Sequence, residues 1–104
     1  MARRVVVTGL GAITPLGNTV ADTWQGIVEG RSGVAEITEF DVSAYNTRFA
    51  ARVDDFDPTA YMPGKDARKF ESFIQYGIAA LEQSISDAGL RDAENVDPVN
   101  EERE

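Results

Sequence analysis

The clearest group of side chains that could do chemistry in this sequence is basic: Lys65, Arg68 and Lys69. Separations of three and four residues place such side chains on one face of a helix. The chain has 10 basic and 18 acidic residues and a formal net charge of −8, so the cluster is a local positive patch that could attract an anionic partner. The alternative is a solvated helix start, in which Lys65 and Arg68 pair with Asp66 or Glu71 for roughly a few tenths of a kcal/mol. Spacing by itself favours this alternative.

The two side chains most often used for nucleophilic and proton-transfer chemistry are missing, because the 104 residues contain no Cys and no His. Without thiolates or imidazoles the sequence predicts no zinc or iron site and no disulfide. The acidic stretch at Asp54, Asp55 and Asp57 lacks the ligand spacing of an EF-hand loop and is interpreted as a solvated turn. Three hydroxyl side chains have no nearby base and are given no nucleophilic role: Thr8, Thr14 and Ser72. We predict no catalytic, metal-binding or cofactor-binding residue.

The glycines at positions 9, 11 and 17 invite comparison with a dinucleotide-binding loop. That fingerprint needs Gly-x-Gly-x-x-Gly, which would place a glycine at position 14, where the chain has Thr14 followed by Pro15. No acidic residue follows a second strand at the expected distance either. The sequence therefore argues against a nucleotide site.

A buried strand is predicted at the start of the chain. Val5, Val6 and Val7 form a continuous β-branched run, which is typical of a strand buried on both faces. Gly9 and Gly11 remove side chains at alternate positions and would let another backbone or helix approach closely. Proline and glycine at positions 15 and 17 end the segment.

Shorter elements are expected next. The spacing of apolar residues predicts a helix over 20–29, with Asn18 or Thr19 as its N-cap and Gly30 as its stop. Weak strand patterns cover 34–40 and 49–53. Asp57 followed by Pro58 is typical of an N-cap and first helical position, and it predicts a single helical turn.

The longest predicted element is a helix from about 66 to 88, in which apolar residues recur at intervals of three and four. Gly77 within it would permit close packing. Gly89 provides a left-handed end to the helix, and Leu90 is the apolar residue expected just past it. Aromatic side chains at helical spacing are more often core than pocket lining, so Trp24, Phe70 and Phe73 are interpreted as core.

Composition and charge set the domain organisation. Residues 1–90 are expected to form one domain, and residues 91–104, with 2 basic and 6 acidic side chains, a disordered acidic tail that carries half of the net charge. The acidic balance disfavours nucleic acid or an anionic membrane surface as a partner. No apolar run approaches the length that spans a bilayer or forms the core of a signal peptide. A cytoplasmic location is therefore expected.

Several motifs resemble the amino-terminal end of a β-ketoacyl-acyl-carrier-protein synthase over about residues 3–90. They are Val-Val-Val-Thr-Gly-Leu-Gly at 5–11, Pro-Leu-Gly-Asn-Thr at 15–19, Trp24 and Gly-Arg-Ser-Gly at 30–33. Phe-Asp-Val-Ser-Ala-Tyr at 40–45, Arg-Lys-Phe at 68–70 and Phe-Ile-Gln-Tyr-Gly at 73–77 are more similar to the type II, chain-elongating enzyme of bacterial fatty acid synthesis.

The resemblance implies an α/β fold: the N-terminal fragment of a thiolase-like layered architecture, with one long central strand, short edge strands and two main helices. It implies decarboxylative condensation of a cysteine-bound acyl group with malonyl-carrier protein, assisted by two histidines. In the family that cysteine and those histidines lie beyond the matched region. We therefore expect a truncated or fragmentary synthase that is inactive by itself.

The resemblance also assigns a role to the basic cluster. In type II elongating synthases a cluster at the matching positions docks the acidic recognition helix of acyl carrier protein, so Lys65, Arg68 and Lys69 are predicted carrier-docking residues. An alternative is a noncatalytic docking or interface module that acts with a second chain carrying the Cys and His. Unpaired edges of the first strand would also favour self-association.

Overall fold

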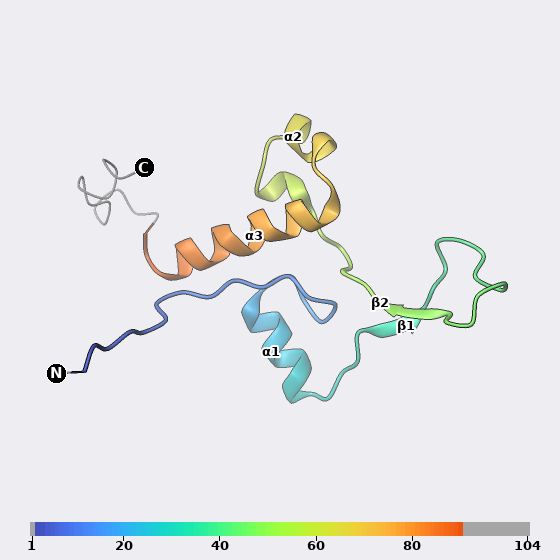
Figure 1. Ribbon diagram of the computed structural model, residues 1–104, viewed down its shortest axis with the longest axis horizontal. Helices are drawn as coiled ribbons and strands as arrows, with labels where there is room; N and C mark the ends of the chain where they lie inside the picture. Colours follow the sequence, from blue (N-terminus) through green and yellow to red (C-terminus); the bar gives the residue numbers. More distant parts are fainter. Residues whose placement is uncertain (1, 91–104) are drawn as a thin grey trace. The chain divides into compact units, whose positions relative to one another are not determined.

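The computed structural model describes residues 2–90, which divide into two compact units. Residues 12–57 form one, here named the α1 unit, and residues 2–11 with 58–90 form the other, the α3 unit. Figure 1 shows the elements along the chain: α1 (Val20–Val28), β1 (Val34–Glu36), β2 (Phe49–Ala51), the 3₁₀ turn η1 (Pro58–Ala60), α2 (Gly64–Lys69) and α3 (Ser72–Asp87).

The predicted first helix is confirmed as α1, and its ends have clear chemical causes. Thr19 is the N-cap: its backbone is extended, and its side-chain oxygen accepts a hydrogen bond from the Asp22 N–H at 3.0 Å. Asp22 also places a negative charge in the first turn, where the helix dipole favours it. Gly30 adopts φ +71°, a left-handed conformation that glycine takes without steric cost, and the helix stops there.

The two predicted short strands are also confirmed, as a two-stranded antiparallel sheet with Val34 opposite Ala51 and Glu36 opposite Phe49. The intervening loop is organised by Arg48, whose guanidinium donates hydrogen bonds to the carbonyl oxygens of Ser43 and Tyr45, each at 3.0 Å. The sheet is therefore a local hairpin within the α1 unit.

In the α3 unit, the amino-terminal segment lies against α3 through its glycines. A Cβ added at Gly9 would overlap the carbonyl oxygen of Ser84, and one added at Gly11 would overlap that of Ala80. Between them, the Leu10 backbone N–H donates to Asp87 Oδ2 at 3.0 Å. The predicted close approach of a helix at these glycines is confirmed.

The predicted strand at Val5–Val7, by contrast, is not formed among the described residues. No ladder partner lies beside this segment within residues 2–90, and the side chains of Val5 and Val7 are 86% and 77% exposed. A strand exists only when a neighbour takes up its backbone hydrogen bonds. The apolar run specifies a preference for burial, and the described residues supply nothing to bury it against.

The prediction of a single helix over 66–88 is wrong, because two extended residues divide this segment into two helices. α2 ends at Lys69, Phe70 (ψ 137°) and Glu71 (ψ 160°) leave the helical region, and α3 begins at Ser72. Apolar spacing continues through the break, so periodicity could not reveal it. The predicted carboxyl end is confirmed, since Gly89 has φ +77° and the Leu90 N–H donates to the Ile85 carbonyl at 3.1 Å.

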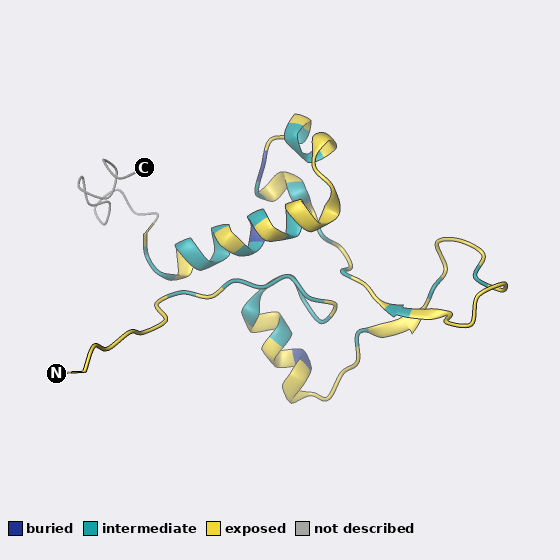
Figure 2. Ribbon diagram, in the orientation of Figure 1, coloured by how far each residue is buried: buried dark blue, intermediate teal, exposed yellow. Residues whose placement is uncertain are grey.

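Burial within residues 2–90 is sparse (Figure 2). Met62 and Ala79, with 8% and 0% exposure, are the buried apolar residues of the described part. Trp24 and Phe73 are 63% and 69% exposed and Phe70 is also exposed, so the core interpretation of these aromatics is wrong. Within the described residues, a Cβ added at Gly77 would meet no atom within 4 Å, so the close packing expected there is not found.

The acidic tail expected over 91–104 lies outside the described residues. Within residues 2–90, no helix combines the length and the apolar character that crossing a bilayer requires.

Candidate functional site

The basic cluster is carried by α2, a short helix whose charges match its dipole. Asp66 stands in the first turn, and Arg68 and Lys69 stand in the last, where carbonyl oxygens without helical partners favour positive charge. The Arg68 side chain extends back towards the start of the helix, with Nη1 3.6 Å from where a Cβ on Gly64 would be. The structure therefore places all three predicted docking residues, including Lys65, on one six-residue helix.

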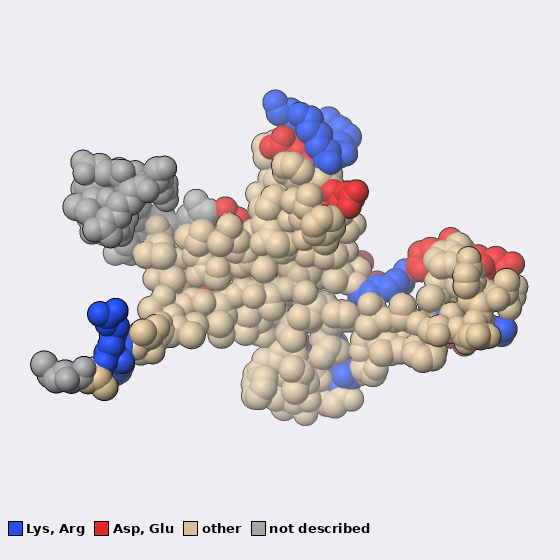
Figure 3. Space-filling model, viewed as in Figure 1, with Lys and Arg blue, Asp and Glu red and all other residues tan. Residues whose placement is uncertain are grey.

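All three cationic side chains of the cluster are exposed, and Figure 3 shows the positive charge gathered over α2. Within residues 2–90 none of the three forms an ion pair or hydrogen bond. The alternative of a merely solvated helix start has Lys65 and Arg68 paired with Asp66 or Glu71. These ion pairs are not found in the described part. The cluster therefore presents positive charge to solvent without an ion-pair partner in the described part.

α2 is held by its neighbours on both sides. Before it, the Met62 N–H donates to the Pro58 carbonyl at 3.1 Å and the Met62 side chain is buried. After it, the side-chain amide of Gln75 in α3 donates to the carbonyl oxygens of Ala67 and Phe70, at 2.7 and 3.2 Å. The sequence gives no signal of this role, because a glutamine in a helical pattern does not reveal the backbone it will contact.

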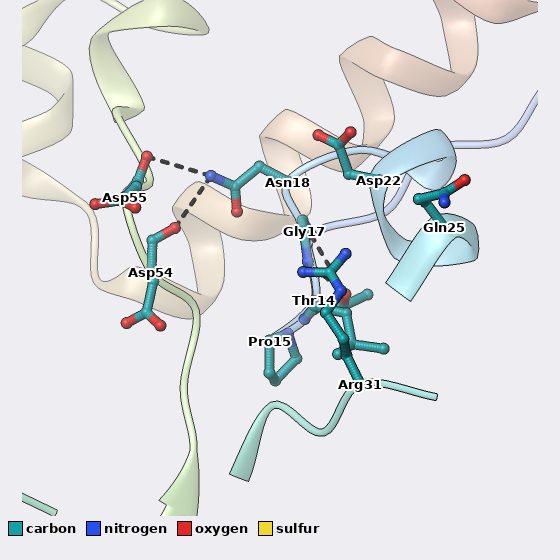
Figure 4. Close-up of a pocket in the computed structure, with 10 residues that line it drawn as sticks. Thr14, Pro15, Gly17, Asn18, Asp22, Gln25, Arg31, Asp54 and Asp55 are labelled. Carbon is teal, nitrogen blue, oxygen red and sulfur yellow. Dashed lines mark hydrogen bonds between the residues drawn. The ribbon is translucent and has the colours of Figure 1, made fainter. Parts of the chain in front are cut away.

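A second candidate site, an open cleft of about 470 Å³ beside the Thr14–Gly17 turn, lies wholly in the α1 unit and is drawn in Figure 4. Its charged lining consists of three carboxylates, from Asp22, Asp54 and Asp55, and one guanidinium, from Arg31. This excess of negative charge disfavours phosphate groups.

The donors of the turn are also occupied, so it does not form a phosphate cradle. The Leu16 N–H donates to Thr14 Oγ1 at 3.1 Å, and the Gly17 N–H donates to the Thr14 carbonyl at 3.1 Å. Phosphate-binding loops need backbone N–H groups that point at the ligand. Thr14 Oγ1 also shares a hydrogen bond of 2.8 Å with Thr23 Oγ1, which makes it a structural hydroxyl.

Asp41 and Glu29, which belong neither to the basic cluster nor to the charged lining of the cleft, have lowered pKa values. The Ser43 backbone N–H, with help from the Ser43 side chain, lowers the pKa of Asp41. The Gln25 side-chain amide, followed by the charge of Arg31, lowers the pKa of Glu29. Both carboxyl groups are exposed and stabilise local turns and helix ends. No group of three or more potential metal-ligating side chains is found among residues 2–90.

The family is shown by comparison with known proteins. The model of the β-ketoacyl synthase N-terminal domain matches residues 2–100, and this chain therefore belongs to the β-ketoacyl synthase family. It is 56% identical over 88 residues to a 3-oxoacyl-(acyl-carrier-protein) synthase 2 from Vibrio harveyi, covering 85% of this chain and 21% of that protein. A synthase of the same name from Synechocystis is 50% identical over 88 residues, which again cover 85% of this chain and 21% of that protein.

Solved structures confirm the fold class. The ishigamide ketosynthase/chain length factor matches with a TM-score of 0.75 and 35% identity, over 91% of this chain and 23% of that one. A β-ketoacyl synthase from Burkholderia phymatum matches with a TM-score of 0.70 and 28% identity, over 91% and 24% of the two chains. The chain is thus an α/β segment of the thiolase-like ketosynthase architecture. It spans about a fifth of the length of the curated relatives it matches.

Proposed function

We propose that this chain supplies the scaffold and carrier-docking surface of a 3-oxoacyl-(acyl-carrier-protein) synthase of fatty acid biosynthesis, and that it does not carry out condensation by itself. The observation that carries the docking role is the basic cluster: Lys65, Arg68 and Lys69 are exposed on one short helix and have no ionic partner within residues 2–90. A cytoplasmic location is part of the same proposal.

The complete reaction belongs to the same proposal. An acyl group is transferred to a cysteine thiolate, malonyl-carrier protein loses CO₂, and the resulting carbanion attacks the acyl thioester to form a carbon–carbon bond and release the thiolate. This chain has no cysteine to hold the acyl group and no histidine to assist decarboxylation. The Thr14 hydroxyl of its glycine turn is hydrogen-bonded to the Thr23 hydroxyl, and within residues 2–90 no base is hydrogen-bonded to it.

Charge explains why a docking role requires a cluster. The chain has a net charge of −8 and repels an acidic protein at long range. Three adjacent cations reverse the potential locally, and complementary patches raise the association rate and fix orientation more than they add affinity. The carrier protein is therefore expected to approach over α2.

The test is a binding titration of this chain with acyl carrier protein at low ionic strength. Arg68→Gln/Lys69→Gln should weaken binding about fivefold, because exposed charge pairs contribute about 0.2–1 kcal/mol each. The matched control is Arg3→Gln/Arg4→Gln, which removes the same charge from exposed residues of the same unit. Equal weakening by both variants, or none by the first, would contradict the docking assignment.

A condensation assay tests the other half of the proposal. The purified chain, given acyl-carrier and malonyl-carrier protein, should form no 3-oxoacyl product and release no CO₂ above background. Product formation by the chain alone would overturn the inactive-scaffold assignment and leave the docking assignment to the titration.

A further inference from the structure

We propose that Gln75 is the positioning residue of the basic cluster: by holding the carboxyl end of α2, it fixes where Arg68 and Lys69 point. This inference rests on the proposed docking function. It assigns Gln75 no contact with the carrier protein itself.

α2 cannot fix its own orientation. It has six residues, and its N-cap, Pro63, makes no side-chain capping hydrogen bond. Isolated helices shorter than about 12–15 residues are marginal in water, because the first turn fixes several dihedral angles for a single hydrogen bond. The direction of its side chains therefore depends on contacts with the rest of the α3 unit.

The Gln75 contacts fall at the point where they control the two cations. The carbonyl oxygens of Ala67 and Phe70 bracket Arg68 and Lys69 in the chain, and both belong to the helix end that lacks internal hydrogen-bond donors. Gln75 Nε2 lies 2.7 Å from the first and 3.2 Å from the second. A side-chain amide has two N–H groups, one for each carbonyl.

Gln75 is itself rigidly placed, in the first turn of the 16-residue helix α3. Its backbone N–H donates to the Glu71 carbonyl at 3.1 Å, and its side chain is half-buried. Together with buried Met62 before α2, it ties the short helix to firmer structure at both ends. The extended residues Phe70 and Glu71 would otherwise be a hinge.

The first test measures α2 directly by amide hydrogen exchange, with no carrier protein present. Gln75→Met keeps the length of the side chain and removes the donor. Exchange at the Phe70 N–H, which donates to the Asp66 carbonyl, should accelerate by about threefold to tenfold, as expected for loss of a hydrogen bond. Gln25→Met, which removes the same group from α1 in the other unit, should leave it unchanged. Unchanged exchange in Gln75→Met overturns the proposal.

The second test asks whether Gln75 acts through the two cations. Gln75→Met should weaken carrier binding about threefold in the parent chain and by less than about 1.5-fold in the Arg68→Gln/Lys69→Gln background, because coupled residues are not additive. A purely structural role would weaken binding equally in both backgrounds and would overturn the proposal, as would unchanged binding in the parent. Gln75→Lys restores a donor and should recover exchange protection; because it also adds a positive charge, its carrier binding does not report on the position of α2.

The two failures are distinguishable. If the chain does not bind carrier protein, or if Arg68→Gln/Lys69→Gln binds as well as the parent, the proposed function fails. The exchange measurement then decides whether Gln75 orders α2, and unchanged exchange overturns that assignment independently.

Discussion

Leu10 and Asp87 are 77 residues apart in the chain and are joined by a hydrogen bond of 3.0 Å from the Leu10 backbone N–H to Asp87 Oδ2. The contact is possible because the flanking positions have no side chains: at Gly9 and Gly11 the backbone comes within van der Waals reach of α3. This bond ties the two ends of the α3 unit together, and its dependence on glycine leads to the first prediction.

Gly11→Ala should destabilise the α3 unit by about 1–3 kcal/mol, since the new methyl group would overlap the Ala80 carbonyl and force the backbone apart. Gly77→Ala is the matched control within α3, where the added methyl group meets nothing within 4 Å. It should stabilise the helix by about 0.5–1 kcal/mol by lowering the backbone entropy of the unfolded chain. Urea unfolding followed by circular dichroism measures both, and destabilisation of equal size in the two variants would argue against the packing role of Gly11.

Thr19→Ala should destabilise α1 by about 1 kcal/mol, because the side-chain oxygen that accepts from the Asp22 N–H is lost. Thr19→Ser keeps that oxygen and should retain most of the stability. Amide exchange of the Asp22 and Thr23 N–H groups reports on the first turn. If amide exchange accelerated as much in Thr19→Ser as in Thr19→Ala, the side-chain hydroxyl would not be the helix cap.

The turn at Asp41 should respond to acid. Asp41 Oδ1 accepts from the Ser43 N–H at 3.0 Å, and this bond lowers the pKa of the carboxyl below its ordinary value of 3.8. A carboxyl whose folded pKa is depressed contributes stability that is present above the unfolded value and lost as pH falls through the folded value. Lowering the pH below about 4 should therefore loosen the turn, and Asp41→Asn should abolish this pH dependence. An NMR titration of the Asp41 carboxyl and the Ser43 amide measures it; a pKa at or above 3.8 would contradict the assignment.

The exposed valine segment should drive self-association. Val5 is 86% exposed, and its segment has no ladder partner among the described residues, which leaves its backbone open to pairing with a strand of another chain. Val5→Lys should lower the association constant measured by sedimentation velocity, because a charged edge residue opposes pairing with another strand. Val28→Lys removes a comparable apolar group from α1 and is the control. Equal loss of association in both variants would point to general hydrophobicity rather than to the strand edge.

Much of the local structure follows from the sequence because its causes are local. Thr19 capping, the left-handed ends at Gly30 and Gly89 and the turn after Asp57 depend on neighbours a few residues away. The close approach at Gly9 and Gly11 is also predictable, since glycines at alternate positions of an extended segment remove the side chains that would keep another backbone or helix away. The spacing of Lys65, Arg68 and Lys69 likewise locates the candidate site, because three cations at intervals of three and four share a helix face.

What tertiary structure alone decided depends on which segments of the chain contact one another. Apolar periodicity predicted one helix where Phe70 and Glu71 separate two, and the contact that steadies the break comes from Gln75, whose partners no local pattern specifies. The apolar character of the valine run and of Trp24 predicts burial, but within residues 2–90 no neighbouring segment covers these side chains. Local preferences are encoded residue by residue, whereas burial and strand pairing exist only when two separate segments meet.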